Sequence, residues 1–132
     1  LTGHTSYVSS VTQLKDGRIV SGSWDETLRV WDLGKREDEE GYFQVLTGHT
    51  DRVTSVIQLT DGRIVSGSLD NTLRVWDLGK REDEEGYVRV LTGHTAFVTS
   101  VTQLKDGRIV SGSVDTTIRV WGYVDPETGD ES

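Results

Sequence analysis

LTGHTDRVTSVIQLTDGRIVSGSLDNTLRVWD, residues 46–77, decides the fold, because nearly the same stretch occurs three times in the chain. The tract LTGHT begins at Leu1, Leu46 and Leu91, so each unit starts 45 residues after the previous one. A fixed period of this size is typical of stacked or radial repeat arrays. We therefore infer the fold from one unit and the function from the differences between units.

Each unit contains short apolar segments separated by turn residues. In the first unit we predict strands over Val8–Leu14, Ile19–Ser23, Thr27–Leu33 and Tyr42–Thr47. The glycine of the Lys-Asp-Gly-Arg sequence can adopt positive φ and predicts a tight turn between the first two strands. No helical period appears in the sequence. Short strands with turn signals at this spacing indicate an all-β blade.

The composition argues against several classes of protein. The formal net charge of −8 disfavours binding to nucleic acid or to anionic lipid, which both favour basic surfaces. Apolar runs are only a few residues long, so we expect no membrane span. The 132 residues include no cysteine, so no disulfide holds the fold, and we expect a cytoplasmic protein.

The acidic residues gather in the sequence GKREDEEGY, which is identical at residues 34–42 and 79–87. Five consecutive charged residues do not fit a core, so we interpret this segment as a solvated hairpin loop. An acidic docking site for a basic partner is the alternative.

A Gly-His dipeptide precedes a Trp-Asp dipeptide in the first two units, as Gly48-His49 precedes Trp76-Asp77 in the second. With the 45-residue period, this pattern resembles that of WD40 repeats over about residues 1–121. The resemblance implies four-stranded antiparallel blades arranged radially around a channel. The third unit departs from the pattern, because Gly122 follows Trp121 where the family has aspartate.

We accordingly expect an all-β fold made of WD40 propeller blades. The expected divisions are repeats over residues 1–45, 46–90 and 91–122 and an acidic C-terminal tail over residues 123–132. We predict eleven strands, because the last blade lacks its outer strand. Three blades span only part of a ring, which leaves two possibilities: a segment of a longer propeller, or a chain that completes a six- or nine-bladed ring with further copies of itself.

The resemblance also implies one buried polar tetrad in each unit. The histidine of the Gly-His dipeptide would join an aspartate of the turn after the second strand, a serine of the second strand and the tryptophan of the third. Such a network stabilises a fold only when every member is satisfied. Ser23 and its equivalents are the second choice for the serine. The expected tetrads are His4, Ser21, Asp25 and Trp31; His49, Ser66, Asp70 and Trp76; and His94, Ser111, Asp115 and Trp121.

A histidine, a serine and an aspartate in one unit also suggest a hydrolase triad, and three histidines suggest a metal site. We expect neither a catalytic triad nor a metal site, and we expect no cofactor. A nucleophile needs an open site with an oxyanion hole, and the histidines lie on different blades. We also expect the repeated arginines Arg29, Arg74 and Arg119 to hold neighbouring blades together.

Only four aligned positions differ in all three units. They fall in the loop entering the first strand and in the turn after the second, which the resemblance places on one rim, the top face, where partners of the family commonly bind. Drift in turns is the alternative, but the turn at the other end of the unit hardly varies. The candidate partner-binding residues are Ser6, Tyr7, Trp24, Glu26, Asp51, Arg52, Leu69, Asn71, Ala96, Phe97, Val114 and Thr116.

We therefore predict a noncatalytic scaffold that recognises a protein or peptide through its top face. Aromatic residues and arginine, which are enriched at interfaces, occur among the varying residues. Two alternatives stay open. One is a propeller fragment that assembles into a closed homo-oligomeric ring and has no ligand of its own. The other is a glycan-binding propeller, with Tyr7 and Trp24 as stacking platforms.

Overall fold

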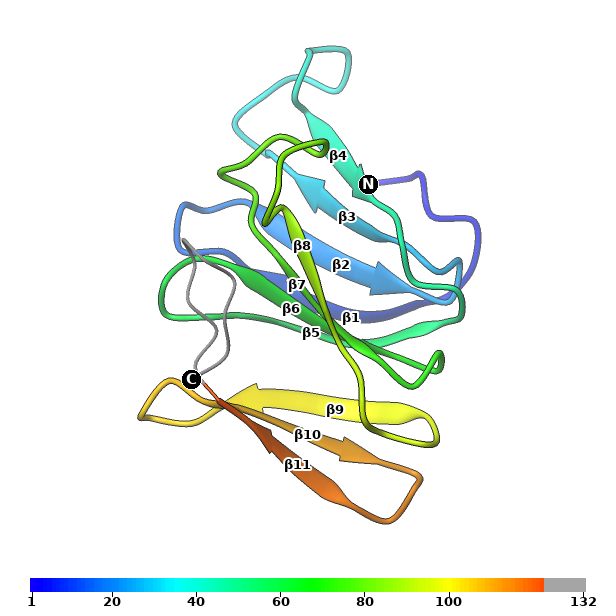
Figure 1. The fold of residues 1–132 in the computed structure, drawn as a ribbon. Coiled ribbons are helices and arrows are strands. Elements are labelled where there is room, and N and C mark those ends of the chain that lie inside the picture. The colour runs from blue at the N-terminus through cyan, green and yellow to red at the C-terminus, as the bar shows by residue number, and fades with distance from the viewer. Residues whose placement is uncertain (123–132) are drawn as a thin grey trace.

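The computed structural model describes residues 1–122, in which all eleven strands are antiparallel and lie in three sheets (Figure 1). The expected acidic tail lies outside the described residues. No helix within residues 1–122 is long and apolar enough to cross a bilayer. The strands are β1 (Val8–Gln13), β2 (Ile19–Ser23), β3 (Leu28–Trp31), β4 (Phe43–Leu46), β5 (Val53–Gln58), β6 (Ile64–Ser68), β7 (Leu73–Trp76), β8 (Val88–Leu91), β9 (Val98–Gln103), β10 (Ile109–Ser113) and β11 (Ile118–Trp121).

The predicted fold class is confirmed. Strands β1 to β4 and β5 to β8 form two four-stranded sheets, and β9 to β11 form a three-stranded sheet. Each sheet is a meander of sequential antiparallel neighbours, and we call it a blade. Most strands are slightly shorter than predicted, because flanking residues close turns. The Leu14 N–H, for example, donates to Arg18 O at 2.7 Å and belongs to the turn after β1.

The core lies between the blades. Leu28, Val30 and Leu46 of the first blade form one buried cluster with Val53 and Val56 of the second. The equivalent residues of the second and third blades form another buried cluster. Burying each aliphatic side chain contributes about 1.5–3 kcal/mol, so these two junctions are the main source of stability.

Glycine in the second strand allows this close packing. A Cβ atom on Gly22 would lie 2.7 Å from Val53 Cγ1 and 3.1 Å from Val56 Cγ1. At the next junction a Cβ atom on Gly67 would lie 2.7 Å from Val98 Cγ1. Each junction therefore pairs a glycine of one blade with valines of the next.

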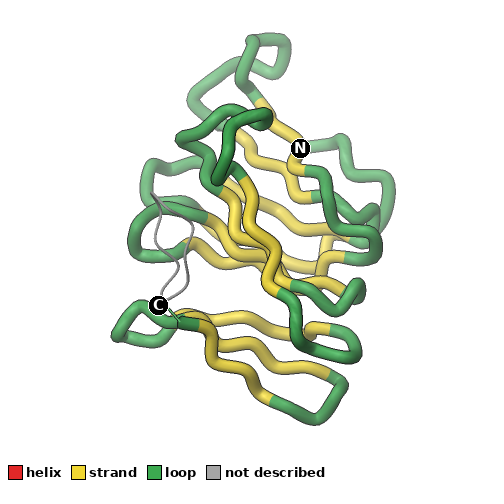
Figure 2. Tube along the Cα trace, viewed as in Figure 1, coloured by secondary structure: helices red, strands yellow, loops and turns green. Residues whose placement is uncertain are grey.

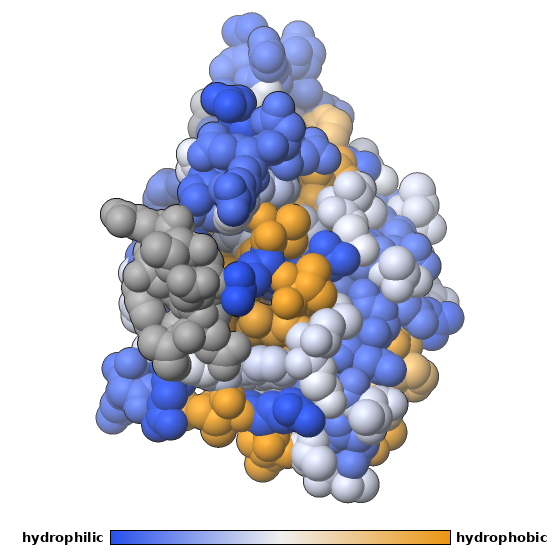
Figure 3. All heavy atoms as spheres, viewed as in Figure 1, coloured by the Kyte–Doolittle hydropathy of each residue, from blue (hydrophilic) through white to orange (hydrophobic). Residues whose placement is uncertain are grey.

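The loops gather at two ends of the blades (Figure 2). The loops that enter β1, β5 and β9 and the turns after β2, β6 and β10 lie at the same end, on the right in Figure 1. We call this end the top face. The charged loops after β3 and β7 are largely exposed, and the region that they occupy is hydrophilic in Figure 3.

Candidate recognition surface and its supporting network

The second blade contains a continuous hydrogen-bonded tetrad below the top face. Asp70 Oδ2 lies 2.8 Å from His49 Nδ1, and His49 Nε2 lies 2.7 Å from Ser66 Oγ. The indole N–H of Trp76 donates to the same Ser66 Oγ at 2.9 Å. Every link is satisfied when His49 carries its proton on Nδ1, because Ser66 then donates to Nε2. The tetrad fixes the loop before β5 against the turn after β6.

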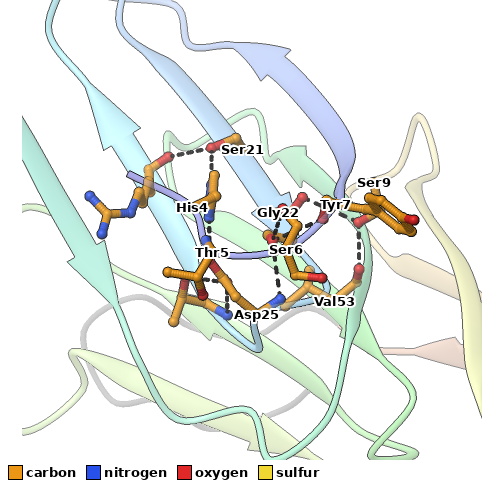
Figure 4. Close-up of polar contacts among 12 residues, drawn as sticks. His4, Thr5, Ser6, Tyr7, Ser9, Ser21, Gly22, Asp25 and Val53 are labelled. Carbon is orange, nitrogen blue, oxygen red and sulfur yellow. Dashed lines mark hydrogen bonds and ion pairs between the residues drawn. The ribbon is translucent and has the colours of Figure 1, made fainter. Parts of the chain in front are cut away.

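The same chain of contacts occurs in the other blades. In the first blade His4 lies 2.8 Å from Asp25 and 2.7 Å from Ser21 (Figure 4). In the third, His94 lies 2.7 Å from both Asp115 and Ser111. The indoles of Trp31 and Trp121 donate to their serines at 3.1 Å and 2.9 Å. The structure thus brings together all residues of the expected tetrads.

Each tetrad aspartate accepts several hydrogen bonds. Burial alone would raise the pKa of Asp25, but hydrogen bonds from Thr27, His4 and Thr5 lower it from 3.8 to about 2. Burial would likewise raise the pKa of Asp70, but hydrogen bonds from His49 and Thr72 hold this pKa well below its ordinary value. These aspartates are ionised in the folded protein and serve as acceptors for the loop backbone.

The tetrad has the hydrogen-bond order of a hydrolase triad but lacks its accessibility. Ser66 is fully buried, and its Oγ lies between the histidine and an indole N–H. No substrate carbonyl can reach such an oxygen without displacing Trp76. Residues 1–122 also contain no group of three or more His, Cys, Asp or Glu side chains that could hold a metal ion.

A second serine of each blade holds the top-face loops by their backbone. Ser23 Oγ donates to Tyr7 O at 2.9 Å and accepts the Asp25 N–H at 3.1 Å. Ser68 and Ser113 donate to the carbonyls of Asp51 and Ala96. Ser23, the second choice for the tetrad serine, therefore belongs to a separate contact. Because these contacts use main-chain oxygens, the side chains of the varying residues are free to differ.

The varying positions lie next to one another in every blade. The Trp24 N–H donates to Tyr7 O at 2.8 Å, and the Leu69 N–H donates to Arg52 O at 2.9 Å. In the third blade the Val114 N–H donates to the carbonyl of Phe97 at 2.9 Å. None of the varying side chains is buried. They lie on the top face, where they are partly or largely exposed, and we call this set of residues the variable rim.

Three side chains of the variable rim form a cluster across the first two blades. The Tyr7 and Trp24 rings meet edge to face, with centroids 4.9 Å apart. Arg52 of the second blade places its guanidinium carbon 4.2 Å from the Trp24 ring centroid. Trp24 is 36% exposed and Tyr7 is 71% exposed, so the cluster presents aromatic surface and a cation to solvent. We call it the Trp24 cluster.

One varying position of each blade lies in the left-handed backbone region. Glu26, Asn71 and Thr116 have φ angles of 77°, 74° and 72°. This left-handed region suits glycine and asparagine and disfavours a β-branched residue. Residues in unfavourable backbone regions concentrate at functional sites. No residue pattern indicates these φ angles directly, although the adjacent Ser-x-Asp turn is visible in the sequence.

The repeated arginines make contacts within their own unit. The Arg74 guanidinium lies against Gly48, where a Cβ atom would be 2.6 Å from Nη1, and 6.0 Å from the Trp76 ring centroid. Gly48 has a φ of 150°, which other residues rarely adopt. These contacts hold the Gly-His loop against the strand of its own unit. The expected role of these arginines between blades stays a prediction.

The arrangement of three antiparallel blades, each fastened by a His–Asp–Ser–Trp tetrad, defines the repeat class found in β-propellers. The sequence model described as "WD domain, G-beta repeat" matches residues 1–32, 41–77 and 86–122. The chain belongs to the WD40 repeat family.

Parts of the chain are also similar in sequence to known proteins. The chain is 56% identical over 36 residues to "small ribosomal subunit protein RACK1" of Caenorhabditis elegans, a match covering 26% of this chain and 11% of that protein. It is also 56% identical over 34 residues to "cross-pathway control WD-repeat protein 2" of Flammulina velutipes, covering 25% and 11%. These matches span about a tenth of each relative's length.

Among solved structures, the WD40 β-propeller domain of Doa1 superposes with a TM-score of 0.72 and 28% sequence identity. The superposition covers 89% of this chain and 37% of that chain. The likeness confirms that the three sheets are blades of the WD40 type.

Proposed function

We propose that the chain is a noncatalytic recognition module that binds a protein or peptide segment through the variable rim. The Trp24 cluster is the observation that carries this proposal. It places the Tyr7 ring and the Arg52 guanidinium against the Trp24 ring, with all three residues exposed to solvent. Tryptophan, tyrosine and arginine are the residue types most enriched among binding hot spots.

The tetrads support this function by holding the rim rigid. The backbone of each varying residue is fixed by serine hydroxyls and by main-chain bonds between the two loops. Contact with Tyr7 and Arg52 also limits the rotamers of Trp24. A partner therefore meets a surface that is largely ordered before binding, which lowers the entropic cost of association.

The chemistry of the cluster indicates what the partner should present. An apolar or aromatic side chain can stack beside Trp24, and a carboxylate can reach the Arg52 guanidinium through paired hydrogen bonds. We expect the bound segment to carry an acidic residue near an apolar one.

The test uses a random-peptide display library selected on the purified chain. The affinity of a selected synthetic peptide is measured by calorimetry for the wild type and for Trp24→Ala. We expect Trp24→Ala to weaken binding roughly tenfold or more. Leu33→Ala is the matched control, because Leu33 is an exposed apolar residue outside the variable rim. Equal affinity for the wild type and Trp24→Ala would contradict the proposal.

A further inference from the structure

At each of the two junctions between blades, one kind of blade face packs against a different kind on the next blade. We call one the valine face, because it carries two valines of the first strand of a blade. We call the opposite one the glycine face, because it carries the glycine of the second strand. The valine pairs are Val8 and Val11, Val53 and Val56, and Val98 and Val101, and the glycines are Gly22, Gly67 and Gly112.

Both junctions use the same contacts. At the first, the backbone N–H of Lys15 donates to Gln58 Oε1 at 2.8 Å; at the second, that of Thr60 donates to Gln103 Oε1 at 3.0 Å. The hydroxyl of Thr54 donates to Val98 O at 2.6 Å. Ser9 makes the equivalent bond to the carbonyl of Val53. One set of apolar and polar contacts therefore joins successive blades.

The valine face of the first blade has no blade against it in the described chain. Val8 is 51% exposed, whereas the equivalent Val53 and Val98 are both 0% exposed. Val11 is 65% exposed, against 4% for Val56. Beside these valines is a hollow of about 160 Å³, which Ile19 also lines. This face displays the residue types that the two internal junctions bury.

The glycine face of the third blade is open in the same way. Ile118 is 74% exposed, whereas Leu28 and Leu73 at the same position are 0% exposed. Among residues 1–122, a Cβ atom on Gly112 would meet only Thr99 Oγ1, at 4.0 Å. The first and third blades lie at opposite ends of the stack in Figure 1. The two open faces therefore point away from each other and cannot meet within these three blades.

We infer that the glycine face of the third blade binds the valine face of the first blade of a second copy of this chain. The first three strands of each internal junction have their counterparts there, and only the fourth-strand residues, such as Leu46 and Leu91, have none among the described residues. On the third blade, Gly112 and Thr99 occupy the positions of Gly67 and Thr54. On the first blade, Gln13 occupies the position of Gln58. The contact is head-to-tail, so successive copies add in one direction until a ring closes or an open assembly forms.

This association is independent of the proposed recognition at the variable rim. The faces are formed by strand residues, and the Trp24 cluster lies within one chain across its first two blades. Trp24 itself faces the internal junction with the second blade, so Trp24→Ala should leave self-association unchanged, and failure of one proposal does not decide the other.

The first experiment measures the mass of the chain of residues 1–132 by light scattering over a range of concentrations. We expect the wild type to rise from 14.7 kDa to multiples of that mass. Val11→Asp places a charge on the valine face, and Gly112→Thr places a β-branched side chain on the glycine face. Each substitution should return the mass to 14.7 kDa.

Neither substitution should harm the monomer, because Val11 is exposed and the space beside Gly112 is open. Circular dichroism checks that both variants remain folded. A wild type that stays at 14.7 kDa throughout would overturn the inference. Association that persists in both variants would overturn it too, because another surface would then be responsible.

Mixing the two variants tests the direction of the contact. Val11→Asp retains a free glycine face and Gly112→Thr retains a free valine face, so one contact can form between them. We expect the mixture to give a complex of twice 14.7 kDa and nothing larger, while each variant alone stays monomeric. A mixture that remains monomeric would refute the head-to-tail arrangement.

Discussion

Removing the tetrad aspartate of the second blade, Asp70→Ala, should destabilise the protein by about 3 kcal/mol. Asp70 Oδ2 accepts hydrogen bonds from His49 Nδ1 at 2.8 Å and the Thr50 N–H at 3.1 Å. Its Oδ1 accepts from the Thr72 N–H at 2.9 Å and the Thr72 hydroxyl at 2.6 Å. The change therefore leaves four donors without an acceptor.

The donors do not contribute equally to this loss. The Thr50 bond lies at the exposed surface, where water can replace the carboxylate. The His49 side chain is fully buried, so its N–H loses its only acceptor without access to water. A buried unsatisfied donor costs about 1–3 kcal/mol, and the Thr72 contacts add about 1 kcal/mol more. A loss of 3 kcal/mol lowers the melting temperature by about 10 °C in a domain of this size.

The assay is urea unfolding followed by tryptophan fluorescence at fixed protein concentration. Asp77→Ala is the matched control, because Asp77 is partly exposed and its side chain accepts the Gly79 N–H at 3.0 Å near the surface. We expect the control to change the unfolding free energy by less than about 1 kcal/mol. If Asp70→Ala unfolds within about 0.5 kcal/mol of the wild type, the tetrad does not stabilise the blade as we describe.

Two further predictions concern acid and the strained turn. The pKa of Asp25 is about 2 in the folded chain and 3.8 ordinarily, so the unfolded chain binds more protons as the pH falls. The urea concentration at the midpoint of unfolding should therefore stay constant above about pH 5 and decline between about pH 5 and pH 2. A midpoint that stays constant between about pH 5 and pH 2 would contradict this role of the tetrad aspartates. Thr116→Asn should stabilise the protein by about 0.5–1 kcal/mol, because asparagine tolerates the left-handed φ of 72° better than threonine does. Calorimetric melting checks this gain, and a lower melting temperature would show that Thr116 makes a compensating contact.

The blade architecture was predictable because the repeat period and the Gly-His and Trp-Asp dipeptides are visible in the sequence. The predicted strand over Ile19–Ser23 agrees with β2 at both ends. The strand predicted over Tyr42–Thr47 is observed only over Phe43–Leu46. The difference arises because the sequence pattern locates the apolar residues of a strand. The ends of the strand depend instead on where the hydrogen bonds between strands are replaced by hydrogen bonds of the turns.

Contacts between units were harder to predict than contacts within them. The sequence marks Trp24 and Arg52 as varying residues, but their stacking depends on the distance between adjacent blades, which no local pattern encodes. The contact of Arg74 with Gly48 was also missed, although both residues belong to one unit, because it joins a loop and a strand that are well separated in the sequence. A glycine that never varies beside a variable loop was the available signal. The binding role of the variable rim stays a prediction.

The most direct test of recognition through the variable rim is a nuclear magnetic resonance spectrum of the four indole N–H groups, with and without a library-selected peptide. The indoles of Trp31, Trp76 and Trp121 donate to buried serines within the tetrads. Trp24 lies on the variable rim, and a Trp24→Phe variant assigns its signal. We expect the peptide to shift the Trp24 indole signal and leave the other three in place. A peptide that shifts a tetrad indole instead, while the Trp24 signal stays fixed, would contradict recognition through this rim.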